Sequence, residues 1–366
     1  MLDLPRLRRE LPDLTETAVA SKHGESPEHR AEPERRAEQR DLLTRHRGLA
    51  TWGERLVPIG EFRTAVAAAG RPLPPAARQA AIDDYLAPRP DGVPVEGPFG
   101  RIAVFGGVYS NHLALAALLE EAARRGAEAV YCLGDLGGFG PNPETVRPLL
   151  EAGGVRSIQG NYEESLAAGR ADCNCGYTDP RDNHFARLSY RYTERNCSPE
   201  FKAWMGGLPR RRRVQVGDRE LLLVHGSPRR INEFLFRSTT PAPFLEVLLD
   251  QERCDALLCT HTGLGWHRRL PSGHDAVNVG AIGRPANDGD PRVRFAMIEA
   301  RHEGGGADRH AALGVELVPL AYDHRALAAE MRRERLPEEF VETILTGWWT
   351  TCLEILPAAE RAASRY

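Results

Sequence analysis

The sequence predicts an α/β fold, because apolar runs of strand length alternate with segments of helical periodicity in the middle of the chain. Residues 101–105 predict a first strand, and the apolar spacing within 113–119 predicts the helix that follows it. A strand at 130–133, a helix near 143–152 and a strand at 155–159 repeat this pattern. The succession is typical of a doubly wound sheet with parallel strands.

The second half of the core predicts strands with a different pairing. Residues 213–224 carry a Gly-Asp turn at their centre and predict a β-hairpin, so the sheet becomes antiparallel there. Strands near 255–259, 275–279 and 293–299 are expected to complete a second sheet. The segment 314–320 predicts a returning edge strand.

Three parts of the chain differ in composition. Residues 1–98 are expected to form an extension that is first charged and then rich in proline. Residues 99–300 predict the core of the protein. Residues 301–366 predict the edge strand and a helical tail packed on the core, where Trp348 and Trp349 are expected to pack between tail and sheet.

Charge and composition exclude several classes of protein. The net charge of −3 argues against a general nucleic-acid or membrane binder, since either would need a basic face. Neither a membrane span nor a secretion signal is indicated, so we expect a cytoplasmic location. The cysteines, seven in all, are an odd and scattered set that suits a reducing compartment better than a disulfide framework.

Four predicted strands end on polar residues that are suited to binding a metal ion. These residues are Asp135, Asn161, His225 and His261. The carboxyl ends of strands in open α/β sheets are where ligands bind, so we expect the four side chains to share one edge. Singly, the aspartate would more often be a helix cap and each histidine a structural residue. Together they predict a metal site.

The order of these motifs resembles that of the calcineurin-like metallophosphoesterases, especially their bacterial members. The resemblance covers roughly residues 99 to 300, and its motifs are specific as a set although each is weak alone. The residues that carry it are Gly134-Asp135-Leu136, Gly160-Asn161, His225-Gly226 and Thr260-His261-Thr262. It implies an α/β fold in which a β-sandwich of two sheets is flanked by helices (α/β/β/α).

The resemblance also implies a ligand set for a divalent metal ion. In this family two metal ions share a bridging aspartate, which matches Asp135. The second ion of the family would be held here by Asp135, Asn161, His225 and His261. Imidazole nitrogens in this set favour manganese, iron or zinc over calcium, which prefers oxygen ligands only.

The family's first metal site is degenerate in this sequence, so one ion per chain is expected. The residues aligned with its missing ligands are Gly107, Tyr109 and Gly263. An alternative is that Asp135 holds an ion at the first site with the help of substitute ligands, because phenolate and thiolate bind iron or zinc. The candidate substitutes are Tyr109, His267 and the pair Cys173 and Cys175.

Further residues are candidates for a direct part in catalysis. Tyr109 and Asn111 lie in the segment aligned with the family's first metal motif, and His267 follows the last metal ligand. Arg229 lies directly after the His225 motif, where its charge would either meet a phosphate or face solvent. Tyr162 replaces a histidine that helps to protonate the leaving group in the family, and the ordinary pKa of tyrosine is too high for that role.

The leading hypothesis is therefore a cytoplasmic, metal-dependent hydrolase of a small phosphomonoester or phosphodiester. One alternative is a degenerate family member that binds a metal or a phosphorylated ligand without turnover. Another is a single-metal enzyme whose substrate is not a phosphoester, because a fold alone does not fix chemistry.

Overall fold

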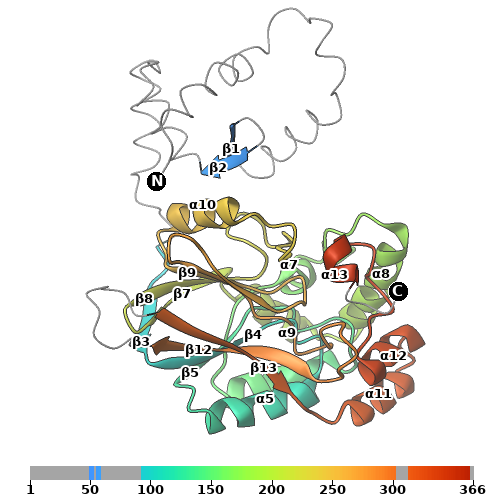
Figure 1. Cartoon of the computed structure of the whole chain (residues 1–366). Helices are drawn as coiled ribbons and strands as arrows, with labels where there is room; N and C mark the ends of the chain where they lie inside the picture. The colour runs from blue at the N-terminus through green and yellow to red at the C-terminus, as the bar shows by residue number, and fades with distance from the viewer. Residues whose placement is uncertain (1–48, 53–54, 59–91, 302–311, 363–366) are drawn as a thin grey trace, which may run out of the picture. The chain divides into compact units, whose positions relative to one another are not determined.

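The computed structural model describes residues 49–52, 55–58, 92–301 and 312–362 (Figure 1). The chain divides into two compact units, one made of residues 1–92 and 240–253 and the other of residues 93–239 and 254–366. The described elements of the first unit are the antiparallel strands β1 (Leu49–Trp52) and β2 (Arg55–Pro58) and helix α10 (Ala242–Glu252). Most of the expected N-terminal extension, and residues 302–311, lie outside the described residues.

The second unit contains a five-stranded sheet in the order β13-β12-β4-β5-β6. Its strands are β4 (Arg101–Phe105), β5 (Ala129–Cys132), β6 (Arg156–Ser157), β12 (Val293–Arg301) and β13 (Ala312–Leu320). Strands β4, β5 and β6 are parallel, as the alternation of strands and helices predicts, whereas β12 is antiparallel to both of its neighbours. The predicted edge strand is β13, which ends the sheet.

A six-stranded sheet in the order β10-β11-β9-β8-β7-β3 lies next to it. Its strands are β3 (Val95–Phe99), β7 (Arg211–Val216), β8 (Arg219–Val224), β9 (Ala256–Cys259), β10 (Trp266–Arg269) and β11 (Asp275–Asn278). Strands β7 and β8 form the predicted antiparallel hairpin. Strand β3 lies inside the segment expected to be an extension, and it joins the sheet by pairing in parallel with β7.

The prediction that the strand near 293–299 belongs to the second sheet is wrong. Strand β12 joins the first sheet, where it lies between β4 and β13. Its alternate residues explain this central position, because Phe295 and Met297 pack on the helix side while Ala296 and Ile298 pack between the sheets. A strand that is buried on both faces is typical of the middle of a sheet.

The core between the two sheets follows from the alternation of side chains along each strand. In β4, Ile102 and Val104 pack against residues of β7, β8, β9 and β11, whereas Ala103 and Phe105 face the helices. Figure 1 shows the two sheets one above the other, with α5 (His112–Arg124) beneath the five-stranded sheet. The structure thus confirms the predicted fold of two sheets flanked by helices.

The outer face of the five-stranded sheet is covered by helices that supply apolar residues to one cluster. These helices are α5, α6 (Val146–Ala152), α7 (Asn161–Ala167) and α9 (Pro199–Gly206), with the short 3₁₀ helix η2 (Pro143–Thr145) before α6. Asn111 caps α5, and its side-chain oxygen accepts a hydrogen bond from the backbone nitrogen of Ala114 at 3.0 Å. Such caps satisfy donors that the first turn of a helix leaves free.

The C-terminal helices pack on α8 (Pro180–Arg195) rather than on a sheet. Helices α11 (His324–Arg333) and α12 (Glu338–Thr346) share an apolar cluster with Phe139, and with Phe185 and Tyr192 of α8. Asp323 caps α11 by accepting a hydrogen bond from the backbone nitrogen of Ala326. Helix α13 (Ala358–Ala362) follows Pro357.

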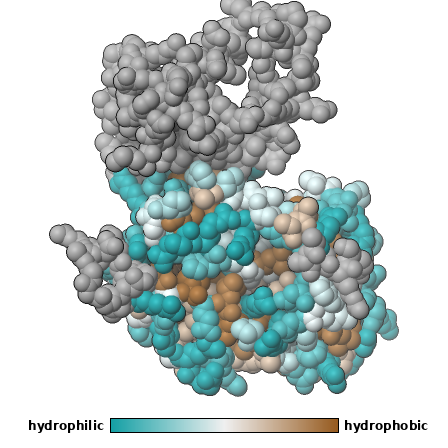
Figure 2. Space-filling view, in the orientation of Figure 1, coloured by the Kyte–Doolittle hydropathy of each residue, from teal (hydrophilic) through white to brown (hydrophobic). Residues whose placement is uncertain are grey.

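The face drawn in Figure 2 carries hydrophobic residues in small groups between hydrophilic ones. Two large apolar side chains are exposed in the described part of the chain, Val95 at 46% and Leu188 at 39%, and single residues of this kind are ordinary on a protein surface. Within the described ranges, none of the helices combines the length and the hydropathy that a membrane span requires.

Candidate metal centre

The four predicted metal ligands meet where the carboxyl ends of the two sheets come together. Asp135 and Asn161 follow β5 and β6 of one sheet, whereas His225 and His261 follow β8 and β9 of the other. The site is therefore divided between two sheets, which corrects the expectation of one shared edge. All four side chains are buried, because they lie at the junction of the two sheets.

One acceptor atom from each of the four predicted ligands lies within a short distance of the others. The Nε2 atom of His225 lies 3.0 Å from Asn161 Oδ1, 3.0 Å from His261 Nδ1 and 3.4 Å from Asp135 Oδ2. Ligand atoms of Asp135, His225 and His261 all lie within 4.8 Å of one another. Asp135, His225 and His261 thus form a cluster of the size that one metal ion bridges.

Hydrogen bonds on the far side of each imidazole ring assign its tautomer. His225 Nδ1 lies 2.6 Å from the Leu133 carbonyl and donates to it, which leaves a lone pair on Nε2. His261 Nε2 lies 3.2 Å from the Cys175 carbonyl and donates to it, which leaves a lone pair on Nδ1. Metal-binding histidines are commonly oriented by such a second hydrogen bond.

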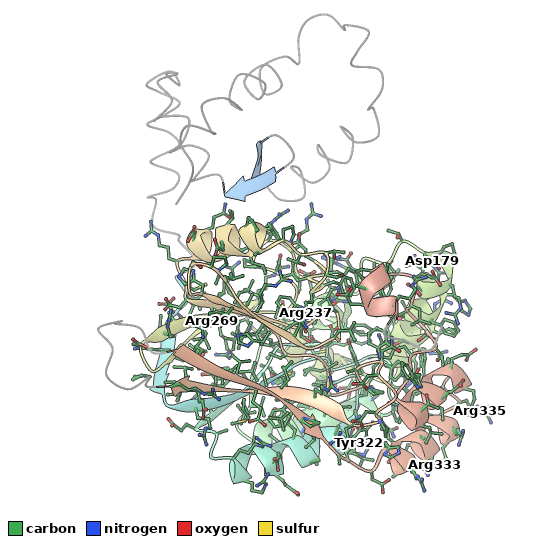
Figure 3. All side chains as sticks on the ribbon, in the orientation of Figure 1. Asp179, Arg237, Arg269, Tyr322, Arg333 and Arg335 are labelled. Carbon is green, nitrogen blue, oxygen red and sulfur yellow. A yellow bond between two sulfur atoms is a disulfide. The ribbon has the colours of Figure 1, made fainter. Side chains whose placement is uncertain are left out.

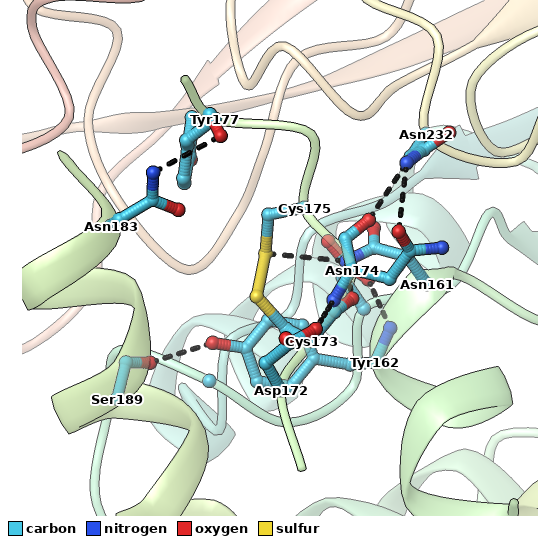
Figure 4. The surroundings of a disulfide bond; sticks show 12 residues. Asn161, Tyr162, Asp172, Cys173, Asn174, Cys175, Tyr177, Asn183, Ser189 and Asn232 are labelled. Atoms are coloured by element: carbon cyan, nitrogen blue, oxygen red, sulfur yellow. Dashed lines mark hydrogen bonds between the residues drawn. A yellow bond between two sulfur atoms is a disulfide. The ribbon is translucent and has the colours of Figure 1, made fainter. Parts of the chain in front are cut away.

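The Asn161 side chain is oriented in the same way (Figure 4). Its Nδ2 donates to the Cys173 carbonyl at 2.8 Å and lies 3.4 Å from Cys175 Sγ, so the Oδ1 atom faces the histidines. With these assignments none of the four converging atoms offers a proton to another. Buried acceptors without a donor are costly unless a cation binds them, so the residues present fit a divalent metal ion.

Burial and the charges of the neighbouring groups shift the pKa values of this cluster. Burial and the neighbouring His225 lower the pKa of His261 to about 3, so its imidazole is neutral. Burial opposes ionisation of Asp135, but His225 and His261 outweigh that effect and hold the pKa of the carboxyl below its ordinary value. Burial likewise opposes protonation of His225, but Asp135 and the Leu133 carbonyl outweigh it and raise the pKa of the ring.

Two glycines allow the ends of β5 and β6 to approach each other closely. Gly134 has a φ of +89°, and a Cβ atom there would overlap the backbone nitrogen of Gly160. A Cβ atom on Gly160 would meet the nitrogen and the carboxylate of Asp135 in turn. The Gly-Asp and Gly-Asn motifs are thus explained by a contact between two backbones that no side chain could enter.

Glu163 ties these two strand ends together. Its carboxylate accepts hydrogen bonds from the backbone nitrogens of Asp135 at 2.8 Å, Leu136 at 2.8 Å and Gly160 at 2.6 Å. Burial, and then the nearby Asp135, raise the pKa of Glu163 to about 7. The residue is fully buried and acts as a positioning group for Asp135 and Asn161. Its place three residues after the Gly160 cap is the sequence signal that could have revealed it.

Backbone strain is concentrated at the same site. Asp135 has a φ of 56°, His261 a φ of 41° and Tyr109 a φ of 49°, all in the left-handed region. Residues other than glycine occupy this region at a cost of about 1–2 kcal/mol each. Asn278 supports the turn that contains His261, since its Nδ2 donates to the Thr262 hydroxyl at 2.9 Å and to the Thr260 carbonyl.

A cavity opens beside the cluster, with Asp135 and His261 in its wall. Aromatic side chains form much of the remaining lining, among them Tyr109, Phe139, Tyr162, Tyr177, Phe234 and Trp349. The Tyr109 ring lies over Gly107, because a Cβ atom on that glycine would come within 3.0 Å of the ring. Burial, and then Asp135, raise the pKa of the Tyr109 hydroxyl, and its role as a substitute metal ligand stays a prediction.

Tyr162 lies in the wall of this cavity, and its phenol group is poorly suited to act as a general acid. Its hydroxyl lies 2.9 Å from the Ser189 hydroxyl of α8, and its backbone nitrogen donates to Asp135 Oδ1 at 3.2 Å. Burial raises the pKa of Tyr162 above its ordinary value. A neutral phenol held in this way is a poor proton donor at neutral pH.

The other predicted catalytic residues have structural partners in the described part of the chain. Asn111 caps α5 and donates to the Ile282 carbonyl at 3.2 Å. His267 lies on β10 and contacts Asp275 Oδ1 at 2.7 Å, and it does not line the cavity. Arg229 lies 3.9 Å from Glu233 and does not line the cavity either. Their catalytic roles stay predictions, and of the predicted catalytic set the cavity includes Tyr109.

Cys173 and Cys175 form a disulfide, which the composition of the chain did not lead us to expect (Figure 4). The two residues are close enough in sequence for this bond to tie a single loop rather than to build a framework. Thiolate ligation of a first-site ion by this pair would require the disulfide to be reduced, so that alternative stays a prediction. The loop instead contributes the backbone carbonyls that orient Asn161 and His261.

Trp349, like Glu163, has a role at the site that the sequence analysis did not predict. It was expected to pack at helical spacing between tail and sheet, but it lies in the loop after α12 and lines the cavity. Its indole nitrogen donates to the Pro285 carbonyl at 2.7 Å, and its ring stacks on Arg284. The contact joins segments far apart in the chain, and no local pattern indicates it.

Comparison with known proteins defines the family. The profile of the calcineurin-like phosphoesterase superfamily domain matches residues 101–303, which is more than half of the chain. The chain therefore belongs to the calcineurin-like phosphoesterase superfamily.

Related proteins share the fold over about two thirds of the chain. A metallophosphoesterase from Sphaerobacter thermophilus is 26% identical, with 68% of this chain and 98% of that chain covered and a TM-score of 0.50. A hypothetical protein from Pyrococcus horikoshii OT3 is 22% identical, with 68% and 99% covered and a TM-score of 0.54. An uncharacterized protein from Methanocaldococcus jannaschii is 22% identical over 255 residues, which are 67% of this chain and 98% of that protein.

The first prediction concerns the close approach of the two backbones. Gly134→Ala is expected to lower the free energy of unfolding by at least about 3 kcal/mol, because the new methyl group overlaps backbone atoms that cannot move aside. Gly154→Ala is the control, since that glycine also has a positive φ but a methyl group added to it would meet no atom within 4 Å. The control should cost only about 1 kcal/mol, as measured by urea unfolding, and equal losses would contradict the account.

The second prediction concerns Glu163. The two carboxylate oxygens of Glu163 accept hydrogen bonds from three buried backbone nitrogens, and Glu163→Gln replaces one of these oxygens with an amino group that cannot accept. The metal affinity should therefore fall by about tenfold to a hundredfold. Isothermal titration with manganese or zinc measures this change. Glu120→Gln, at an exposed position of α5, is the matched control and should bind metal as the unaltered chain does. Unchanged affinity in Glu163→Gln would show that this carboxylate does not position the ligands.

Proposed function

We propose that this chain is a metal-dependent phosphoester hydrolase that uses one divalent ion held by Asp135, Asn161, His225 and His261. The observation that carries the proposal is the convergence of four buried acceptor atoms, none of which can donate a proton to another. Membership of the calcineurin-like phosphoesterase superfamily and the aromatic cavity beside the cluster support it. Manganese, iron and zinc are the ions that this ligand set favours.

A divalent ion bound there would act as a Lewis acid and would lower the pKa of a water molecule. The residues of the chain would supply orientation and exclusion of bulk water. Leu133 and the 173–175 loop hold the imidazole and amide groups in place, while Glu163 fixes the backbone of Asp135. The substrate would enter the cavity lined by Tyr109 and Tyr162, whose hydroxyls remain protonated.

A second candidate function is the binding of a metal or a phosphorylated ligand without turnover. It is favoured by the residues aligned with the family's first metal site, because Gly107 and Gly263 offer no side-chain ligand and the Tyr109 ring lies over Gly107. The protonated state of Tyr162 favours it as well, since no strong general acid faces the cavity from that position. Both functions require the same metal ligands, so turnover distinguishes them.

We also propose a cytoplasmic location. Five cysteines of the described residues are free and buried, namely Cys132, Cys197, Cys254, Cys259 and Cys352. These free thiols suit a reducing compartment, whereas the Cys173–Cys175 disulfide does not.

The third prediction is that metal binding stabilises the chain through this ligand set. At a free ion concentration about 100 times the dissociation constant, the free energy of unfolding should rise by about 2.7 kcal/mol. His225→Ala should remove this stabilisation and the bound ion, as measured by thermal unfolding and elemental analysis. His324→Ala, at the start of α11, is the control and should retain one ion per chain. Two ions per chain would contradict the proposed occupancy, and none would contradict the site.

The fourth prediction concerns turnover. The chain loaded with manganese, iron or zinc is expected to hydrolyse an activated aryl phosphodiester or phosphomonoester, whose leaving group needs no general acid. Asn161→Ala and His225→Ala should each abolish the activity, while His324→Ala should retain it. Absence of turnover with every metal, in a chain that still binds one ion, would reject the hydrolase and favour the binding protein.

A further inference from the structure

Arg284 is a buried cation in the wall of the cavity that also contains Asp135 and His261. It lies in the loop that follows β11, and only 7% of the residue is exposed. The four metal ligands do not include it. By contrast, Figure 3 shows Arg333 and Arg335 at the rim of the molecule beside α11, where arginines are ordinarily found.

The guanidinium group packs against two aromatic rings. Its central carbon lies 3.3 Å from the centroid of the Trp349 ring and 5.6 Å from that of Phe139. Trp349 is itself fixed, because its backbone nitrogen donates to Asn287 Oδ1 at 2.8 Å and its indole nitrogen donates to the Pro285 carbonyl. The group is therefore oriented before any ligand arrives, which lowers the entropic cost of binding one.

The charge of Arg284 has no carboxylate partner in the described part of the chain. Its Nε atom is buried and has no hydrogen-bond partner there. The Cys352 thiol is the polar side chain that contacts the guanidinium, and a thiol is a weak acceptor. A buried charge without a counter-ion is strongly unfavourable, so this arrangement indicates that an anionic group completes the site.

We propose that Arg284 binds the non-bridging oxygens of a phosphoryl group that lies between it and the metal ligands Asp135 and His261. This inference rests on the proposed function and names the residue that recognises the substrate. A guanidinium suits the role because its fork of donors matches two oxygens of a phosphate at once. It also brings a permanent positive charge to the cavity in addition to that of the metal ion.

The proposal predicts opposite effects on binding and on stability. Arg284→Met keeps much of the apolar contact with Trp349 and removes the charge. The affinity for inorganic phosphate should fall by about tenfold to a hundredfold, the loss expected for charge-assisted hydrogen bonds. The thermal midpoint should stay the same or rise, because an unpaired buried charge has been removed. A residue with a purely structural role would lower the midpoint instead.

The experiment is isothermal titration of the full-length chain, loaded with manganese, with inorganic phosphate. Arg333→Met is the matched control, because it removes an exposed arginine of α11 and should bind phosphate as the unaltered chain does. Arg284→Lys keeps the charge but loses the fork and the stacking, so its affinity should lie between those of the unaltered chain and of Arg284→Met. This second variant also tests the proposal if Arg284→Met does not fold.

The outcomes separate this inference from the proposed function. Metal affinity should be the same in Arg284→Met and in the unaltered chain, because Arg284 is not a metal ligand. If metal and phosphate both bind the Arg284→Met chain normally, the role of Arg284 is wrong while the metal site stands. If the unaltered chain binds metal but no phosphate, the phosphoryl-binding role is overturned. Loss of metal binding in the unaltered chain would instead reject the proposed function.

Discussion

The candidate site depends on the contact between the ends of β5 and β6. Gly134 and Gly160 let the two backbones touch, and Glu163 accepts three backbone hydrogen bonds across the junction. This contact sets the position of Asp135 and Asn161 before any ligand binds. The opposite sheet then brings His225 to within 3.0 Å of Asn161, so the junction between the sheets becomes the metal centre.

The N–H groups of His225, Asn161 and His261 that point away from the metal centre have hydrogen-bond acceptors, whereas the acceptor atoms of these side chains that point into it have no hydrogen-bond donor in the described part of the chain. The Leu133, Cys173 and Cys175 carbonyls accept the protons of His225, Asn161 and His261, respectively. A divalent cation would satisfy all of the acceptor atoms that remain. The wall of the cavity beside them also contains Arg284, a buried cation with no carboxylate partner among the described residues. The metal ligands require a cation, whereas Arg284 requires an anion. A phosphoryl group bound to the metal ion and to Arg284 would satisfy both.

The sequence predicts the strands and the four ligands well, because both are local properties. Apolar runs that end in Gly-Asp, Gly-Asn and His-Gly indicate strand ends, whatever sheet the strand joins. The assignment of β12 to the wrong sheet, and of all four ligands to one edge, arose because pairing between strands depends on contacts far apart in the chain. Arg284 and Trp349 were missed for the same reason, since 65 positions separate 284 from 349 and only the fold stacks them. The N-terminal extension lies largely outside the described residues, so its predicted character stays a prediction.

The central claim is that one cation lies among Asp135 Oδ2, Asn161 Oδ1, His225 Nε2 and His261 Nδ1. The most direct measurement is a crystal structure of the chain grown with manganese or zinc, with diffraction data collected at the absorption edge of that metal. The account predicts one anomalous peak within bonding distance of all four atoms. A peak beside Tyr109 that two or more of these atoms do not touch, or no peak at the junction of the sheets, would contradict it.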